Sequence, residues 1–181
     1  MKNPFLIGKT IYLRPMELDD APILQAWLND PDVRRTLRIH QPLNRLQEEE
    51  FLRNHAQSET DFLVGIVTKS DDRLIGSFGL TLGPLKDRKA RFGIMIGAKE
   101  EWDKGYGSEA TRMMLAHAFE TLNLNRVALD VYEFNPRAIK TYERAGFKRE
   151  GLQRKALYRE GRYWDVIPMA ILREEWDALS K

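Results

Sequence analysis

The sequence predicts an α/β (α+β) fold in which helices cover the faces of a mixed, mostly antiparallel central sheet. Two observations lead to this prediction. Strand-like and helix-like segments alternate without a regular repeat, and the 181 residues are 43% hydrophobic and 31% charged, the balance of an ordinary globular protein. Because a domain has about 100 to 200 residues, we expect a single domain over residues 1–181.

The first predicted elements are a short strand and two helices. Residues 10–14 alternate β-branched, aromatic and aliphatic side chains until Pro15 ends the strand. A helix capped by Asp19 or Asp20 follows and ends shortly before Pro31, after which a second short helix is expected. The apolar stripe of the first helix consists of Ile23, Leu24, Trp27 and Leu28.

An acidic run, residues 48–50, lies within a third helical pattern. Leu46, Phe51 and Leu52 frame the run at helical spacing. The run therefore predicts a solvated helix face, and we assign it no chemistry.

The middle of the chain predicts most of the sheet. The runs 61–68 and 73–82 predict a hairpin, because the four residues between them favour turns, and the run 90–97 extends it. A helix over 105–122 then precedes a strand over 125–134. If the strands on either side of this helix are parallel, ligands bind beyond their carboxyl ends, near the start of the helix.

The last part of the chain predicts one helix and a closing hairpin. Residues 135–144 form the helix, with Pro136 in its first turn and Gly146 just past its end. Residues 147–158 and 163–172 then pair around a tight turn.

Composition excludes several classes of protein. Lys and Arg number 29 and Asp and Glu 27, and this net charge of +2 is too small to indicate a nucleic-acid partner. The absence of cysteine excludes disulfides and thiol nucleophiles, and His40, His55 and His117 are too far apart in sequence for a metal site, so no metal is expected. No apolar run approaches the ~18 residues of a membrane span, so we expect a cytoplasmic protein without a membrane partner.

A glycine turn, Lys104-Gly105-Tyr106-Gly107-Ser108, opens the long helix. Glycines allow several backbone N–H groups to point at one anion, and the helix N-terminus adds positive potential, so a diphosphate would fit here. A tight turn without a ligand explains the same glycines equally well.

Two nucleotide-binding motifs fit less well. Gly105, Gly107 and Ala110 match the dinucleotide fingerprint, and Asp130 follows about twenty residues later. However, residues 98–104 separate these glycines from the preceding strand, and Asp130 lies inside the next strand. No Walker loop is present, because no Gly-Lys-Ser/Thr follows a glycine at the required spacing.

Residues 135–147 decide between these alternatives. Together with the glycine turn, they resemble the GNAT superfamily of acetyl-CoA-dependent N-acetyltransferases. The resemblance runs from residue 10 to residue 172 and includes Leu13-Arg14-Pro15 and residues 27–31, as in the branch of ribosomal-protein N-terminal and spermidine acetyltransferases. It implies the GNAT fold with a splayed parallel pair of strands, acetyl-CoA as co-substrate and no metal.

The resemblance implies cofactor contacts in three segments. Backbone amides of the turn would cradle the CoA pyrophosphate, although Trp102 departs from the Gln or Arg that the family places first. Backbone groups of Met95 and Ile96 would pair with the pantetheine amides. Asn135 would contact the pantetheine arm, although a helix N-cap explains it too, and Lys140 is a further expected contact. The turn residues are Asp103, Lys104, Gly105, Tyr106, Gly107 and Ser108.

The resemblance makes Tyr142 the general acid, which would protonate the departing thiolate; packing in the core is the alternative for this tyrosine. The acceptor amine would attack the acetyl carbonyl directly, with the Met95 amide at the oxyanion, so no acyl-enzyme is needed. The general base stays open. Arg91 occupies the position where many members have glutamate and cannot be a base, which leaves Glu133, Asp165 or a water chain.

The resemblance implies that the acceptor is an amine, either a protein or peptide N-terminus or a small molecule. Residues 31–43 and 157–165, which the resemblance places around it, have a positive balance that favours an acceptor carrying a carboxylate over a polyamine such as spermidine. Two other functions stay open: a catalytically silent CoA-binding sensor or assembly subunit, and a dinucleotide-binding enzyme. A homo-oligomer is compatible with all three.

Overall fold

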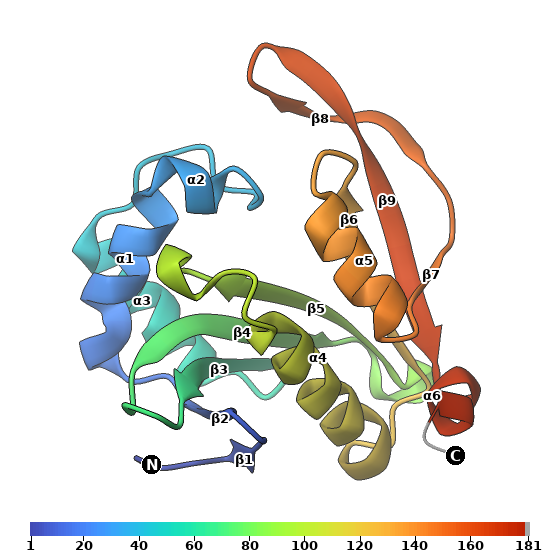
Figure 1. Cartoon of the computed structure of the whole chain (residues 1–181), viewed down its shortest axis with the longest axis horizontal. Coiled ribbons are helices and arrows are strands. Elements are labelled where there is room, and N and C mark those ends of the chain that lie inside the picture. The colour runs from blue at the N-terminus through green and yellow to red at the C-terminus, as the bar shows by residue number, and fades with distance from the viewer. Residues whose placement is uncertain (180–181) are drawn as a thin grey trace. The chain divides into compact units, whose positions relative to one another are not determined.

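The computed structural model describes residues 1–179, which form two compact units. The first unit contains Met1–Thr81 and Gly93–Met113, and the second contains Leu82–Phe92 and the residues from Met114 onward. Strand β5 and helix α4 belong partly to each unit, and Figure 1 shows these elements with the others. Their bounds are Lys89–Ile96 for β5 and Tyr106–Ala116 for α4.

Four consecutive antiparallel strands belong to the first unit. Ile11, Tyr12 and Leu13 of the second strand are at most 1% exposed, so this strand lies in the core. The predicted strand and hairpin are confirmed, whereas the first strand escaped prediction because it has only two residues. The strands are β1 (Leu6–Ile7), β2 (Ile11–Pro15), β3 (Asp61–Thr68) and β4 (Leu74–Leu82).

Three helices complete the first unit: α1 (Ala21–Asn29), α2 (Pro31–Arg34) and α3 (Arg45–Ala56). The carboxylate of Asp30 accepts the first amides of α2, and Asn44 and Gln47 form a capping box at the start of α3. The helices meet in one apolar cluster that also includes Met95 of β5. The end of β5 is therefore anchored in the core of this unit, and the cluster's other buried residues are Ala21, Leu24, Val33 and Leu52.

Strand β6 (Arg126–Tyr132) has strand partners on both sides in the second unit. It pairs in parallel with β5 over Lys89–Arg91 and in antiparallel with β9 (Arg162–Leu172) along its whole length. This arrangement confirms the parallel pair and the mixed, mostly antiparallel fold class. The parallel register ends at Arg91 and Ala128.

The closing hairpin differs from the sequence prediction. The predicted single strand 147–158 is wrong, because β7 (Lys148–Arg149) and β8 (Gln153–Arg159) pair with different parts of β9. The exposed Gly151 lies between them, and Lys155 has a left-handed φ of 52° where the register of β8 shifts. A bulge of this kind strengthens the local twist of a strand.

The remaining helices precede or follow β6 in the chain. Helix α4 continues as a π-helix over residues His117–Thr121, so the predicted extent of this helix is confirmed while its last turn is wider. Helix α5 (Pro136–Arg144) is confirmed and ends before Gly146, whose φ is 99°. Helix α6 (Arg173–Leu179) was not predicted, and its Trp176 stacks on Phe119 with ring centroids 5.9 Å apart.

The predicted solvated face of α3 is wrong at Glu48. This residue is 3% exposed, whereas the apolar Leu46 is 60% exposed. Because residues four apart share a helix face, Glu48 lies on the same side as the buried Leu52. Among the described residues, Glu48 Oε1 has no hydrogen-bond partner, and burial raises the pKa of this carboxyl group.

We predict that Glu48→Gln stabilises the protein at neutral pH. A carboxyl group whose pKa is raised in the folded state destabilises the folded protein relative to the unfolded chain as the pH rises above 4.5, the ordinary pKa of the group. The melting temperature of the variant should exceed that of the wild type at pH 7 by about 2 to 4 °C, the shift for each kcal/mol in a chain of this size, and match it near pH 4. Thermal unfolding at both pH values measures this.

Glu50→Gln is the matched control, because Glu50 belongs to the same acidic run but is exposed. Its melting temperature should follow the wild type at both pH values. An equal shift of Glu48→Gln at both pH values would show that charge burial is not the cause.

Candidate active site

The predicted anion site lies in the first unit, where a short turn leads into α4. Asp103 and Gly105 have φ values of 63° and 86°, so the backbone is left-handed twice within three residues. The helix begins at Tyr106, and the amide of Glu109 bonds back to the Gly105 carbonyl at 3.0 Å. The first amides of a helix have no partner within it, so those of residues 106–108 are available to an anion.

Glycine keeps the surface open at this helix start. A methyl group at Gly105 would meet nothing within 4 Å, and one at Gly107 would meet only Ile96 Cγ1 at 3.9 Å. The side chains of Asp103 and Lys104 are exposed beside them, and Ser108 is half-buried. The turn therefore brings all six residues predicted in this segment to one place, with room for a phosphate against the backbone.

Hydrogen bonds of Trp102 and Glu101, the two residues directly before the turn, hold it in place. The Trp102 indole donates a 2.7 Å hydrogen bond to the Ile96 carbonyl, which gives this side chain a structural role at the position where the resemblance leads one to expect Gln or Arg. Glu101 is 7% exposed and accepts hydrogen bonds from Arg73 and, at 3.0 Å, from Lys104. Lys104 is therefore already paired within the turn.

The end of β5 is shaped by a β-bulge. The amides of Gly97 and Ala98 both donate to the Ile75 carbonyl, at 2.9 and 3.1 Å. Met95 is 8% exposed, so its side chain is core and only its backbone could serve a ligand. The Ile96 carbonyl accepts the hydrogen bond of the Trp102 indole.

Tyr142 lies on α5 in the second unit, between two other aromatic rings. Its ring contacts Phe92 and Phe147 edge-on, with centroids 5.6 and 5.9 Å apart. Burial raises the pKa of Tyr142 to about 12, so its phenol is protonated throughout the physiological range. Within the described part of the chain its hydroxyl donates no hydrogen bond, so the proton is available to a ligand.

Asn135 and Lys140 are the other predicted site residues in this unit. The Asn135 side chain accepts a hydrogen bond from the Ala138 amide at 3.1 Å, so it caps α5. This cap uses the carbonyl oxygen of the side chain and leaves its NH₂ group for a ligand. Lys140 is exposed on α5.

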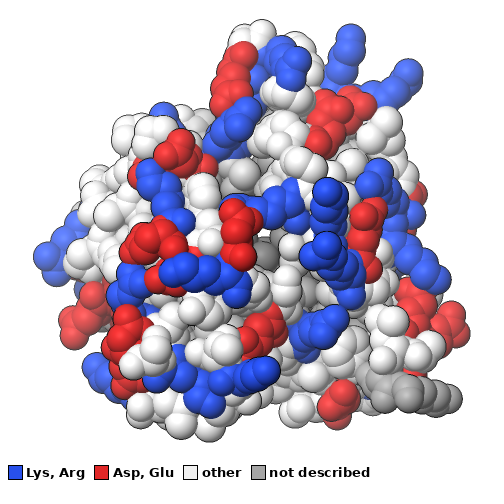
Figure 2. All heavy atoms as spheres, viewed as in Figure 1, with Lys and Arg blue, Asp and Glu red and all other residues white. Residues whose placement is uncertain are grey.

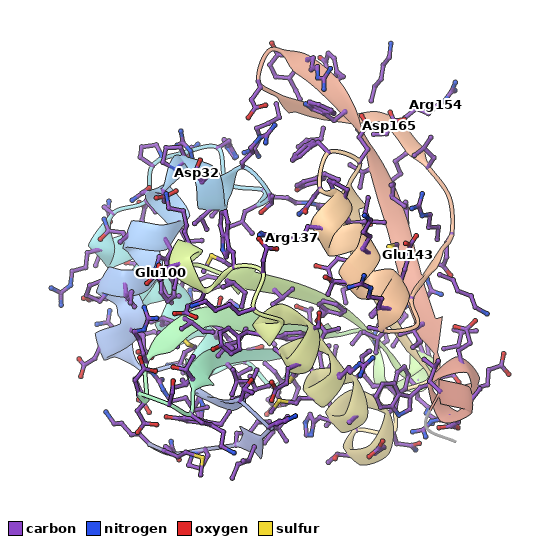
Figure 3. The ribbon with its side chains drawn as sticks, viewed as in Figure 1. Asp32, Glu100, Arg137, Glu143, Arg154 and Asp165 are labelled. Carbon is purple, nitrogen blue, oxygen red and sulfur yellow. The ribbon has the colours of Figure 1, made fainter. Side chains whose placement is uncertain are left out.

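The residues considered for the general base have structural partners. Arg91 pairs with Asp130 at 2.6 Å, and Asp130 lies inside β6 as predicted. The Asp165 amide donates to Glu133 Oε1 at 2.9 Å, and the Lys155 amide donates to Asp165 Oδ1 at 2.8 Å. Glu133 thus links the end of β6 to β9, and Asp165, which Figure 3 labels, links β8 to β9.

The first predicted acceptor segment, residues 31–43, begins at a charged junction. Lys99 Nζ lies 2.8 Å from carboxylate oxygens of both Asp30 and Asp32. Lys99 offsets one of these two negative charges, and the three arginines that follow keep the segment positive. They are Arg34, Arg35 and Arg38.

The second acceptor segment is the β8–β9 turn. Tyr158 and Tyr163 are 61% and 62% exposed, with rings 5.0 Å apart. The Arg162 guanidinium lies 3.3 Å above the Trp164 ring, a cation–π contact. Across the face in Figure 2, basic and acidic side chains are interspersed, as the small net charge leads one to expect.

A family model described as an acetyltransferase (GNAT) domain matches residues 10–148. The chain belongs to the GNAT acetyltransferase family. Among its relatives, the spermidine N(1)-acetyltransferase of Vibrio cholerae is 31% identical over 94% of this chain and 97% of its own. The putative ribosomal N-acetyltransferase YdaF of Bacillus subtilis is 37% identical over 59% of this chain and 58% of its own.

A solved structure of this GNAT fold agrees over nearly the whole chain. The spermidine N-acetyltransferase of Vibrio cholerae in complex with CoA and spermine superposes with a TM-score of 0.86, 27% identity and coverage of 92% of this chain and 98% of that chain. The predicted family, fold class and co-substrate are confirmed. The protein is an acetyl-CoA-dependent N-acetyltransferase, which moves an acetyl group to an amine.

Within the described residues, no three His, Cys, Asp or Glu side chains gather in a way that could hold a metal ion. The same part of the chain contains no helix long and apolar enough to cross a membrane.

Sequence reasoning missed the ion pairs beside the glycine turn. Glu101 stands only three positions before Lys104, so the chain turn between them is enough to bring the two side chains together. Arg73 carries no such signal, since it is 28 residues from Glu101 and reaches it only through the fold.

We predict that Gly76→Ala disrupts the β5 bulge. A methyl group at Gly76 would overlap the Met95 carbonyl oxygen, a backbone atom that cannot swing aside. The variant should lose roughly 1 to 3 kcal/mol of stability, measured by urea unfolding, and bind acetyl-CoA more weakly. Gly93→Ala, on β5, is the control, because a methyl group there meets nothing within 4 Å. Equal stability of the two variants would contradict this account of the bulge.

Proposed function

We propose that this N-acetyltransferase binds acetyl-CoA through the 103–108 turn and transfers the acetyl group within a ternary complex to a small amine or a peptide N-terminus. The observation that carries the proposal is the start of α4, where two left-handed residues and open glycines leave helix amides for a diphosphate. The match of the family model over residues 10–148, which spans both units, supports treating the chain as one catalytic domain.

Cofactor binding is assigned to residues of each unit. In the first, amides of the turn hold the pyrophosphate, Lys104 and Ser108 add a charge and a hydroxyl, and backbone groups of Met95 and Ile96 pair with the pantetheine arm. In the second, the NH₂ of Asn135 binds the same arm, and Lys140 contributes a positive charge.

Acetyl-CoA supplies the acetyl group as a thioester. The acceptor nitrogen forms a C–N bond to the acetyl carbonyl carbon, and the C–S bond of the thioester breaks. Tyr142 is proposed to donate a hydrogen bond to the departing sulfur. An ordinary thiol has a pKa of about 8.5, so a phenol with a pKa of about 12 is the weaker acid. Tyr142 therefore stabilises the negative sulfur chiefly by hydrogen bonding, and its proton moves only where the sulfur is also shielded from water.

The acceptor nitrogen must lose a proton as the C–N bond forms. Arg91 cannot take it, and Glu133 and Asp165 each keep one carboxylate oxygen occupied by a backbone amide. We therefore propose that the amine enters uncharged and passes its proton to water. An α-amino group, with a pKa of about 7.7 to 8.0, does so more readily than an alkylamine such as that of lysine, at about 10.4.

The proposed acceptor carries an anionic group near its amine. The segment after Asp32 has three arginines and no acidic side chain up to residue 43, which disfavours a polycation. Residues 157–165 contain two arginines and two acidic residues, so they add no net charge. A spermidine acetyltransferase among the relatives supports a small-amine acceptor in general. Incubation with acetyl-CoA and a panel of peptides, amino acids, spermidine and aminoglycosides, read by mass spectrometry, tests the acceptor. Acetylated spermidine as the main product would overturn the charge argument, and acetyl-CoA binding without any product would favour the sensor function.

We predict that Tyr142→Phe lowers kcat by roughly 10²-fold while acetyl-CoA binds as in the wild type. The phenylalanine keeps the packing against Phe92 and Phe147 and removes only the donor. Because the pKa of Tyr142 is about 12, the wild-type rate should show no loss from its ionisation up to about pH 10. Thiol release and calorimetry measure the two quantities.

Tyr132→Phe is the matched control, since Tyr132 is a buried tyrosine of the same unit with no assigned role. It should keep its turnover within about twofold of the wild type. Unchanged turnover in Tyr142→Phe would remove the phenol from the mechanism.

A further inference from the structure

A chain of ion pairs runs from the start of β4 to the turn before α4, entirely within the first unit. Arg73 lies 2.5 Å from Glu100 and also pairs with Glu101. The second carboxylate oxygen of Glu101 lies 3.0 Å from Lys104. Figure 3 labels Glu100 in the segment that leads into α4. Arg73 thus reaches, through Glu101, a lysine of the proposed pyrophosphate turn.

The members of this chain differ in exposure. The Glu101 side chain is 8% exposed, whereas those of Arg73 and Glu100 are 40% and 61% exposed. A surface pair such as Arg73 with Glu100 contributes little, because water and salt screen it. A nearly buried carboxylate is different, since removal of one partner leaves a charge that water cannot solvate. The Arg73–Glu101 pair is therefore the one whose loss has consequences.

Loss of the Arg73–Glu101 pair would affect the 103–108 turn. Glu100, Glu101 and Asp103 precede the helix start, and each of these acids opposes the binding of a phosphate there. Lys104 can bind either Glu101 or a phosphate. While Arg73 neutralises Glu101, Lys104 can turn to an incoming anion; without Arg73, Glu101 keeps the lysine and repels the phosphate.

We propose that Arg73 is a positioning residue for acetyl-CoA, acting through Glu101 to keep the phosphate-binding turn free of an uncompensated negative charge. The inference rests on the proposed function, which places the pyrophosphate at this turn. It adds a residue from the β3–β4 connection, far from the glycine motif in sequence, to the determinants of cofactor affinity.

Arg73→Gln, Glu101→Gln and the double variant test the proposal by calorimetry with acetyl-CoA and by steady-state kinetics. Arg73→Gln should raise Kd and KM for acetyl-CoA roughly tenfold, with kcat and the acceptor KM within about twofold. The loss should shrink at about 0.5 M salt, where charges are screened. The double variant has no buried charge at position 101 and should recover to within about threefold of the wild type.

Arg45→Gln is the matched control, because Arg45 forms an exposed pair with Glu49 on α3 of the same unit. It should leave every constant unchanged. Unaltered acetyl-CoA affinity in Arg73→Gln, or a double variant as weak as Arg73→Gln, would overturn the role of Arg73. Should Arg73→Gln fail to fold, Glu101→Gln alone decides, since it must bind acetyl-CoA at least as tightly as the wild type.

Wild-type protein separates this inference from the proposed function. If the wild type does not bind acetyl-CoA, the assignment of the pyrophosphate site fails, and the inference fails with it. If the wild type binds normally and Arg73→Gln binds equally well, only the role of Arg73 fails.

Discussion

The backbone amides at the start of α4 are a constraint on the whole first unit. They must face outward without partners, in a chain whose preceding residues Asp103 and Gly105 are both left-handed. Such a turn is not stable by itself, because a non-glycine residue in this conformation costs about 1 kcal/mol or more. It depends on contacts made elsewhere, and the indole of Trp102 on the Ile96 carbonyl is the most direct of these.

The same requirement explains the close packing at the end of β5. A methyl group at Gly97 would overlap the Trp27 indole, so α1 can approach the strand only where the side chain is absent. The Ile75 carbonyl then takes both bulge amides, and Met95 completes the apolar cluster of the helices. Burial of that cluster fixes β5, β5 fixes Ile96, and Ile96 holds the turn through Trp102. The position of the anion site therefore depends on the packing of this apolar cluster.

The parts of this fold with local signals could be predicted from the sequence. Pro136 and Gly146 bound α5, and the glycines mark the start of α4, because both depend on the conformations of single residues. Glu48 was mistaken for a surface residue because its acidic neighbours dominate the pattern, and only packing against other elements decides which face of α3 is buried. Arg73 was missed for a related reason, since it precedes β4 and its partners follow β5, the neighbour of β4 in the sheet.

The two buried glutamates of the first unit, Glu48 and Glu101, differ in whether their negative charge has partners. Glu101 has an arginine and a lysine for its two oxygens, whereas Glu48 Oε1 has no hydrogen-bond partner among the described residues. An apolar residue in place of a buried ion pair is often neutral or stabilising, so stability alone does not explain Glu101. Its two cations join β4 to the turn in one register, which an apolar side chain could not specify. The cost of burying this charge is therefore consistent with a role at the cofactor site.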